Sequence, residues 1–174
     1  IRRQRQMCIR DSILTEKQIP FHWIYLIFSE KQYEDLEKLE TKYGNEYVEV
    51  HPIYTGDNLP FFEENVYLAE EDILQSNYDK QDIFAHQVMN TNFWGRLSVL
   101  PDGKVYSNLN HPPLGTLKDR VYDLIVDEMT SKRAWRWIRD EVSPCKDCLF
   151  RYLCPSPSNY ELVIGKPNLC HVKP

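Results

Sequence analysis

Four cysteines near the carboxyl end of the chain have a spacing that suits a metal centre. They follow the pattern C-x2-C-x5-C-x15-C and comprise Cys145, Cys148, Cys154 and Cys170. Two cysteines three positions apart can ligate one centre from a single turn, and a loop can return the later two. Zinc and iron–sulfur clusters both accept four thiolates, so the residue types leave that choice open. Structural zinc sites more often present two tight pairs, whereas here only the first pair is tight.

Structural disulfides and unligated core cysteines are the alternatives to a metal centre. No apolar secretory signal is visible in the printed sequence, so we expect a reducing compartment, in which clustered cysteines favour metal over disulfides. Cys8 stands apart from the cluster, and His171 could replace Cys170 as the fourth ligand. Ligating thiols must be deprotonated. Three basic residues close in sequence are expected to favour the thiolates: Lys146, Arg151 and Lys166.

A series of motifs between residues 95 and 170 points to a known family. LPDGKVYSN is followed by PLGTL, by a segment containing WRWIRD, and by CKDCLFRYLC. This order resembles the SPASM domain, the C-terminal extension of radical S-adenosylmethionine enzymes that modify ribosomal peptides. The resemblance implies that residues 21–76 are the closing βα units of an incomplete radical-SAM barrel.

The chain departs from the SPASM pattern at one of the two auxiliary clusters of that family. Ser107-Asn108 and Ser158 stand where the family places cysteines of the first cluster. The ligands of the second cluster correspond to the four cysteines named above. The resemblance therefore implies one 4Fe–4S cluster, with zinc as an alternative or substitute.

The motif that radical chemistry requires is missing from the printed sequence. That motif is C-x3-C-x2-C, and Cys8 is the only cysteine before residue 145. S-adenosylmethionine binding is therefore not supported, and no catalytic residue is assigned. The tail CPSPSNYELVIGKPNLCHVK resembles the pseudo-radical-SAM proteins of Bacteroidales peptide-modification systems, which lack this motif.

Three functions remain as hypotheses. The first is a non-catalytic accessory protein that binds a precursor peptide or a partner maturase. The second is the C-terminal part of an active radical-SAM peptide maturase, and the third is a zinc-stabilised interaction module. An upstream C-x3-C-x2-C would favour the enzyme.

Other polar groups have simpler interpretations. Residues 55–58, TGDN, follow an expected strand and form either a turn or a ligand loop, the turn being favoured. Arg133, Arg136 and Arg139 recur every three residues and are expected on a solvated face, with contact to an acidic leader peptide as the alternative. No Ser/His/Asp set, Cys/His set or phosphate loop is visible.

Composition excludes several classes of protein. The chain has 174 residues and a formal net charge of −5, which argues against a general nucleic-acid binder. No apolar run is long enough to cross a bilayer, so we expect a soluble, cytoplasmic protein without membrane partners. The opening IRRQRQMCIRD lacks an initiator Met and is typical of a fragment of a longer protein.

The first half of the chain is predicted to contain a strand–helix–strand unit. FHWIYLIF at residues 21–28 is typical of a strand buried on both faces, and YVEVHPIY at 47–54 of a second strand. Between them, Ser29 and Gln32 form a capping-box pattern and Gly44 is a plausible helix end. This order predicts a βαβ unit with parallel strands. A further helix is expected at 60–76, and residues 82–92 are ambiguous.

The second half is predicted to be a small α+β module. Pro101-Asp102-Gly103 predicts a β-hairpin, and the Thr116–Asp119 pair predicts the start of an amphipathic helix that includes Leu117. A short helix is expected at 131–140, with Ala134, Trp137 and Ile138 facing inward, followed by a cysteine-rich loop. The predicted fold is α/β, with a partial βα-barrel segment at 1–92 and a SPASM-like domain at 93–174.

Overall fold

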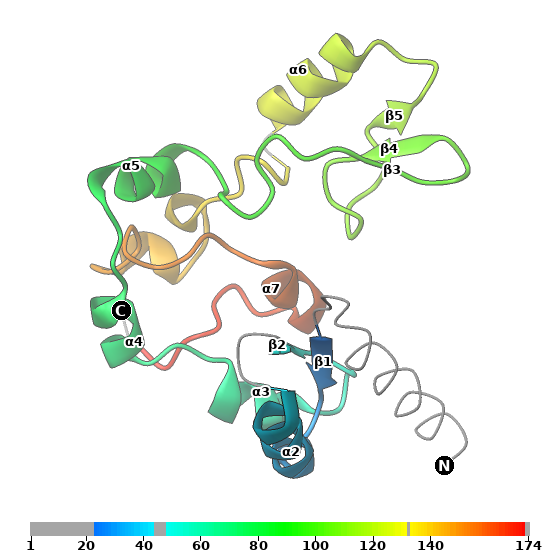
Figure 1. Ribbon diagram of the computed structural model, residues 1–174. Coiled ribbons are helices and arrows are strands. Elements are labelled where there is room, and N and C mark those ends of the chain that lie inside the picture. Colours follow the sequence, from blue (N-terminus) through cyan, green and yellow to red (C-terminus); the bar gives the residue numbers. More distant parts are fainter. Residues whose placement is uncertain (1–22, 44–47, 132, 173–174) are drawn as a thin grey trace. The chain divides into compact units, whose positions relative to one another are not determined.

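The computed structural model describes residues 23–43, 48–131 and 133–172 (Figure 1). The chain divides into two compact units, Ile1–Phe61 and Phe62–Pro174. Helices and strands are mixed, and the described strands form a two-stranded and a three-stranded sheet. None of the helices within these ranges is long and apolar enough to span a membrane. Cys8 and Gly44 lie outside the described residues, as do the first residues of the two predicted strands, 21–22 and 47.

The first unit contains the predicted strand–helix–strand order. Strand β1 (Trp23–Ile27) pairs in parallel with β2 (Val48–Pro52), and Tyr25 lies opposite Val50. A short 3-10 turn, η1 (Glu30–Gln32), and helix α2 (Tyr33–Tyr43) connect them. The prediction of parallel strands joined by a helix is therefore confirmed.

Burial of the first strand differs from the sequence prediction. Ile27 is buried, but Ile24 and Leu26 are more than half exposed, at 59% and 52%. A two-stranded sheet therefore buries alternate residues of β1, and the expectation of burial on both faces is wrong for this unit. The Ser29 side chain makes no capping hydrogen bond, whereas the Gln32 side-chain carbonyl accepts from the Phe28 N–H at 2.8 Å.

The segment at residues 55–58 is a structural turn. The Asn58 side-chain amide donates to the carbonyls of Phe28 at 3.0 Å and Ile53 at 2.9 Å, which follow β1 and β2. Its carbonyl accepts from the Thr55 N–H at 2.9 Å. These bonds use the Asn58 side chain to join the ends of the two strands, which supports the turn over the ligand loop.

The second unit begins with three short helices. They are α3 (Leu59–Asn65), whose first residues belong to the first unit, α4 (Glu70–Gln75) and α5 (Lys80–Val88). The single helix predicted at 60–76 is interrupted because Leu68 pairs with the tail. Its N–H donates to the Leu169 carbonyl and its carbonyl accepts from the His171 N–H, both at 3.0 Å.

The predicted hairpin forms two strands of a three-stranded antiparallel sheet, with β4 in the centre. Strands β3 (Ser98–Val99) and β4 (Lys104–Tyr106) flank the turn, and β5 (Gly115–Thr116) pairs with β4. Gly103 has φ +80°, a conformation that glycine adopts without steric cost.

The next helix begins later than predicted. The Asp119 carboxylate accepts from the Thr116 N–H at 2.7 Å, but this pair closes a turn before α6 (Val121–Ser131). Leu117 therefore lies outside the helix and is 68% exposed. On the helix itself, Leu124 and Glu128 are buried.

Residues 133–140 do not form the predicted α-helix, and Ser131, where that helix was expected to begin, ends α6. Glu128 Oε1 accepts from the N–H groups of Ala134 at 2.7 Å and Trp135 at 2.9 Å, so a carboxylate takes the place of helical carbonyl acceptors. Ala134 and Trp135 are the buried residues here, whereas Trp137 and Ile138 are half-buried. The prediction that Trp137 and Ile138 face inward with Ala134 is therefore only partly met.

The cysteine-rich tail contains more regular structure than the predicted loop. It includes the 3-10 turns η3 (Arg139–Glu141) and η4 (Cys145–Asp147) and helix α7 (Asn159–Ile164). Residues before 93 pack with this tail, since the buried Asn90 side chain donates to the Pro157 carbonyl at 2.8 Å. The compact units thus divide at Phe61, and the domain boundary predicted after residue 92 stays a prediction.

Candidate metal centre

The four predicted ligands line one cavity in the second unit. Cys145 begins η4 and Cys148 directly follows it as the C-cap, with the Cys148 N–H donating to the Cys145 carbonyl at 3.0 Å. Cys154 closes the next turn, where its N–H donates to the Phe150 carbonyl at 3.0 Å. Cys170 comes from the segment that pairs with residue 68. Three separate segments therefore deliver thiols to the same place.

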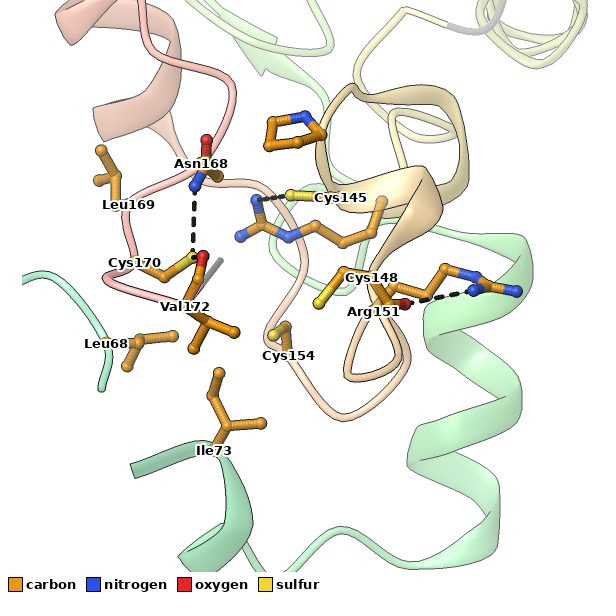
Figure 2. Close-up of a pocket in the computed structure, with 12 residues that line it drawn as sticks. Leu68, Ile73, Cys145, Cys148, Arg151, Cys154, Asn168, Leu169, Cys170 and Val172 are labelled. Atoms are coloured by element: carbon orange, nitrogen blue, oxygen red, sulfur yellow. Dashed lines mark hydrogen bonds between the residues drawn. The ribbon is translucent and has the colours of Figure 1, made fainter. Parts of the chain in front are cut away.

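The cavity that these segments enclose is lined mainly by apolar and thiol groups, together with Arg139, Arg151 and Asn168. Its empty volume is about 430 Å³, part of which is open to solvent, and Leu68, Ile73 and Leu169 contribute to its wall. Figure 2 shows the four cysteine side chains around this space, and all four thiols are free. None of the four cysteines therefore forms one of the structural disulfides considered as an alternative.

The thiols surround the cavity without meeting at a single point. Within residues 23–43, 48–131 and 133–172, no three His, Cys, Asp or Glu side chains are grouped as one metal ion requires. The structure therefore brings the predicted ligands to one pocket but does not give them the spacing of a closed zinc site.

Burial controls the protonation of two of the thiols. It raises the pKa of Cys154 to about 11, and the neighbouring cysteines act in the same direction while Arg139 opposes them. Burial also raises the pKa of Cys145, again against the influence of Arg139. In the metal-free protein these two thiols hold their protons at neutral pH, so a metal must displace protons to bind.

The cation nearest the thiols is Arg139, which differs from the sequence prediction. Its Nη1 donates to the Cys145 Sγ at 3.8 Å, and the side chain is buried. Of the predicted cations, Lys166 pairs with Glu63 at 2.8 Å. Arg151 lines the cavity, but it donates to the Cys148 carbonyl at 3.2 Å and pairs with Asp140 at 2.7 Å. Lys146 is exposed.

The arginines at 133, 136 and 139 do not form the expected solvated face. Arg133 pairs with Asp127 at 2.8 Å, Arg136 is half-buried and Arg139 is buried. The one-in-three spacing implied a single helical face, but the segment is not an α-helix. Nothing in the sequence distinguished Arg139 from its two neighbours.

His171 does not replace Cys170 at the cavity. Its ring Nε2 lies 2.8 Å from the Glu63 carbonyl oxygen, and its ring packs against Tyr67. Cys170 instead lines the cavity, where its Sγ accepts from the Asn168 side-chain amide at 3.3 Å. Cys170 is therefore the fourth thiol of the set.

The residues at the positions of the first auxiliary cluster, Ser107, Asn108 and Ser158, have protein hydrogen-bond partners. Asn108 is buried, and its side-chain amide donates to Asn159 Oδ1 at 2.7 Å. Asn159 directly follows Ser158 in the sequence. Ser107 donates to Glu128 Oε2 at 2.7 Å, and Ser158 accepts from the Tyr160 N–H as the cap of α7. Each of these three side chains is therefore hydrogen-bonded to a different protein group.

Comparisons with known proteins identify no relative of this chain. No family model, curated protein or solved structure matches the chain. The similarity to the SPASM domain therefore rests on the sequence motifs alone and stays a prediction.

Proposed function

We propose that this chain is a non-catalytic accessory protein of ribosomal peptide modification that holds one 4Fe–4S cluster. The cluster ligands are Cys145, Cys148, Cys154 and Cys170, and the protein resembles the SPASM-containing, radical-SAM-like proteins that lack the catalytic cluster motif. It acts in the cytoplasm by binding a precursor peptide or a partner maturase, without nucleic-acid or membrane partners. Residues 21–76 would then correspond to the end of a radical-SAM barrel.

One observation supports the metal centre above the others. Four free thiols from three segments line one largely apolar cavity, and a buried guanidinium donates to one of the sulfurs. Bound to four thiolates, an iron–sulfur cluster supplies redox-active iron shielded by the surrounding side chains. Because each iron of such a cluster takes a separate thiolate, thiols that surround a space suit it better than they suit one zinc ion.

The accessory role rests on the sequence resemblance. An active radical-SAM enzyme needs three more clustered cysteines, and the printed chain offers only Cys8 outside the tail. If this chain carried the radical activity, adding S-adenosylmethionine and a strong reductant to the iron-loaded protein would release 5′-deoxyadenosine. We expect none from this chain. Because the enzyme hypothesis places the C-x3-C-x2-C motif upstream, the same assay on the parent protein separates the two hypotheses, and release of 5′-deoxyadenosine there would favour the enzyme.

Reconstitution with iron tests the ligand set directly. The protein is loaded anaerobically with ferrous iron and sulfide, and the visible absorption of the bound cluster is recorded. Single Cys→Ser changes at the four positions should each reduce the bound iron, whereas Cys8→Ser serves as the matched control and should not. Equal loading of all five variants would overturn the assignment, and zinc binding without iron loading would favour the interaction module.

Limited proteolysis tests whether the metal organises the tail. The region from residue 144 contains five prolines, so ligation should contribute to its ordering. We expect Cys148→Ser to open cleavage after Glu141 while sites between residues 23 and 61, which belong to the first compact unit, stay protected as in the wild type. A tail as resistant as that of the wild type would mean that the cysteines are incidental to its structure.

A further inference from the structure

Arg139 is a charged residue buried within the cysteine-rich tail. Only 7% of its side chain is exposed. Arginine is rarely buried unless it is paired, because removing the charge from water is costly. Its partner is Glu161, which is buried with it and accepts from Nη2 at 2.7 Å. The pair is neutral as a whole and uses only Nη2 of the guanidinium. Nη1 and Nε can therefore donate to other acceptors.

Those donors reach each of the three segments that carry the cysteines. Nη1 donates to the Cys145 sulfur at 3.8 Å and to the Pro167 carbonyl at 3.3 Å, and Nε donates to the Pro155 carbonyl at 3.1 Å. Pro155 directly follows the third cysteine, and Pro167 comes three residues before the fourth. One planar group with fixed donor directions therefore joins the segments that must come together for four thiols to face one cavity.

The same contact places a positive charge beside a ligand sulfur. When thiolates bind metal they carry negative charge, and hydrogen bonds to the sulfurs together with the net charge set the potential of an iron–sulfur cluster. Glu161 accepts from the other terminal nitrogen of the guanidinium, Nη2, and its second carboxylate oxygen accepts from the Ser158 N–H at 2.8 Å. The carboxylate thus fixes the orientation of Arg139, while Nη1 is directed at the sulfur.

We infer that Arg139 is a positioning residue of the four-cysteine site, which it assembles from three chain segments and provides with a fixed hydrogen bond to the Cys145 sulfur. This inference rests on the proposed function. It predicts that replacing Arg139 weakens metal binding and shifts the cluster potential, even where the fold persists.

The test compares Arg139→Gln and Arg139→Lys with Arg133→Gln as the matched control. Arg133 also forms a 2.8 Å carboxylate pair in this unit, but with Asp127 and away from the cysteines. Zinc affinity is measured by competition with a chromophoric chelator, and the reduction potential of the iron-loaded protein by an anaerobic redox titration. Far-UV circular dichroism checks folding.

We expect Arg139→Gln to weaken zinc binding by about 10- to 100-fold, the usual effect of losing a group that orients a metal ligand. Its cluster potential should become more negative, because the reduced cluster loses a stabilising positive charge. Arg139→Lys keeps the charge but not the fork, so it should retain much of the potential while losing affinity. Arg133→Gln should match the wild type in both measurements.

Two outcomes separate the failure of this inference from that of the proposed function. A wild-type protein that binds neither zinc nor iron overturns the proposed function itself. A wild type that binds metal, together with an Arg139→Gln variant of equal affinity and potential, overturns the inference alone. If Arg139→Gln fails to fold, the double variant Arg139→Met/Glu161→Leu removes both buried charges and should fold. Wild-type affinity and potential in that folded variant would equally overturn the inference.

Discussion

Removing Glu161 should destabilise the second unit strongly. In the native structure Glu161 Oε1 accepts from Arg139 at 2.7 Å, and Oε2 accepts from the Ser158 N–H at 2.8 Å and from its hydroxyl at 2.5 Å. The Glu161→Ala change leaves the Arg139 guanidinium buried without a counter-charge. It also removes one half of the capping box at the start of α7.

The expected loss follows from the burial of the pair. The two side chains are 7% and 3% exposed, and breaking such a pair by removing one partner costs about 3–5 kcal/mol. With a urea dependence of about 2 kcal/mol per M, this lowers the unfolding midpoint by roughly 2 M. Since whole domains are stable by about 5–15 kcal/mol, the loss is a large fraction of the total.

A second ion pair in the same unit provides the matched control. Glu63 and Lys166 lie 2.8 Å apart, almost the same distance, but their side chains are 42–43% exposed. Exposed pairs contribute about 0–1 kcal/mol because water and salt screen them. Glu63→Ala should therefore move the midpoint by about 0.5 M or less.

Tryptophan fluorescence in a urea titration measures both variants, with a chelator present to keep the protein free of metal. Three of the four tryptophans, at positions 94, 135 and 137, belong to the second unit, so the signal reports mainly its unfolding. The double change Arg139→Met/Glu161→Leu should recover most of the loss, because no unpaired charge stays buried.

Equal losses for Glu161→Ala and Glu63→Ala would refute the argument from burial. A double variant as unstable as Glu161→Ala would show that the uncompensated guanidinium is not the cause.

Three further predictions concern single residues of the second unit, each measured by urea denaturation. Glu128→Ala should cost about 3–5 kcal/mol because it leaves the buried N–H groups of Ala134 and Trp135 without an acceptor, and a loss below about 1 kcal/mol would contradict this. Because burial raises the pKa of Cys154 from 9.0 to about 11, the folded metal-free protein binds this proton more tightly than the unfolded chain does. The contribution of this thiol to the free energy of unfolding is therefore present below pH 9 and is lost as the pH rises towards 11. In the Cys154→Ala variant stability should fall less steeply over this pH range, and a slope equal to that of the wild type would refute the prediction. Gly165 ends α7 with φ +73°, so Gly165→Ala should cost about 1 kcal/mol and Gly165→Asn less; equal stability of the two variants would contradict the strain argument.

Local sequence signals predicted the elements that depend on few residues. The hairpin formed where Pro101-Asp102-Gly103 stands, because its turn needs only a residue that tolerates positive φ. The strand–helix–strand order was also correct. The four cysteines line one cavity, so their spacing contained real information about the tertiary structure.

The failures occurred where distant residues compete for backbone groups. Glu128 takes the N–H groups of Ala134 and Trp135, and Leu68 pairs with the tail, so helical patterns at both places are interrupted. Arg139 was missed for a related reason. Its burial depends on Glu161, a partner 22 positions away that local periodicity does not reveal.

The central claim is that Cys145, Cys148, Cys154 and Cys170 hold one iron–sulfur cluster. Its most direct test is the iron, zinc and acid-labile sulfide content of the wild-type protein purified without oxygen, read together with its absorption spectrum. We predict about four irons and about four sulfides per chain, with broad visible absorption that bleaches on reduction. Zinc at about one ion per chain without sulfide, or no metal at all, would contradict the claim.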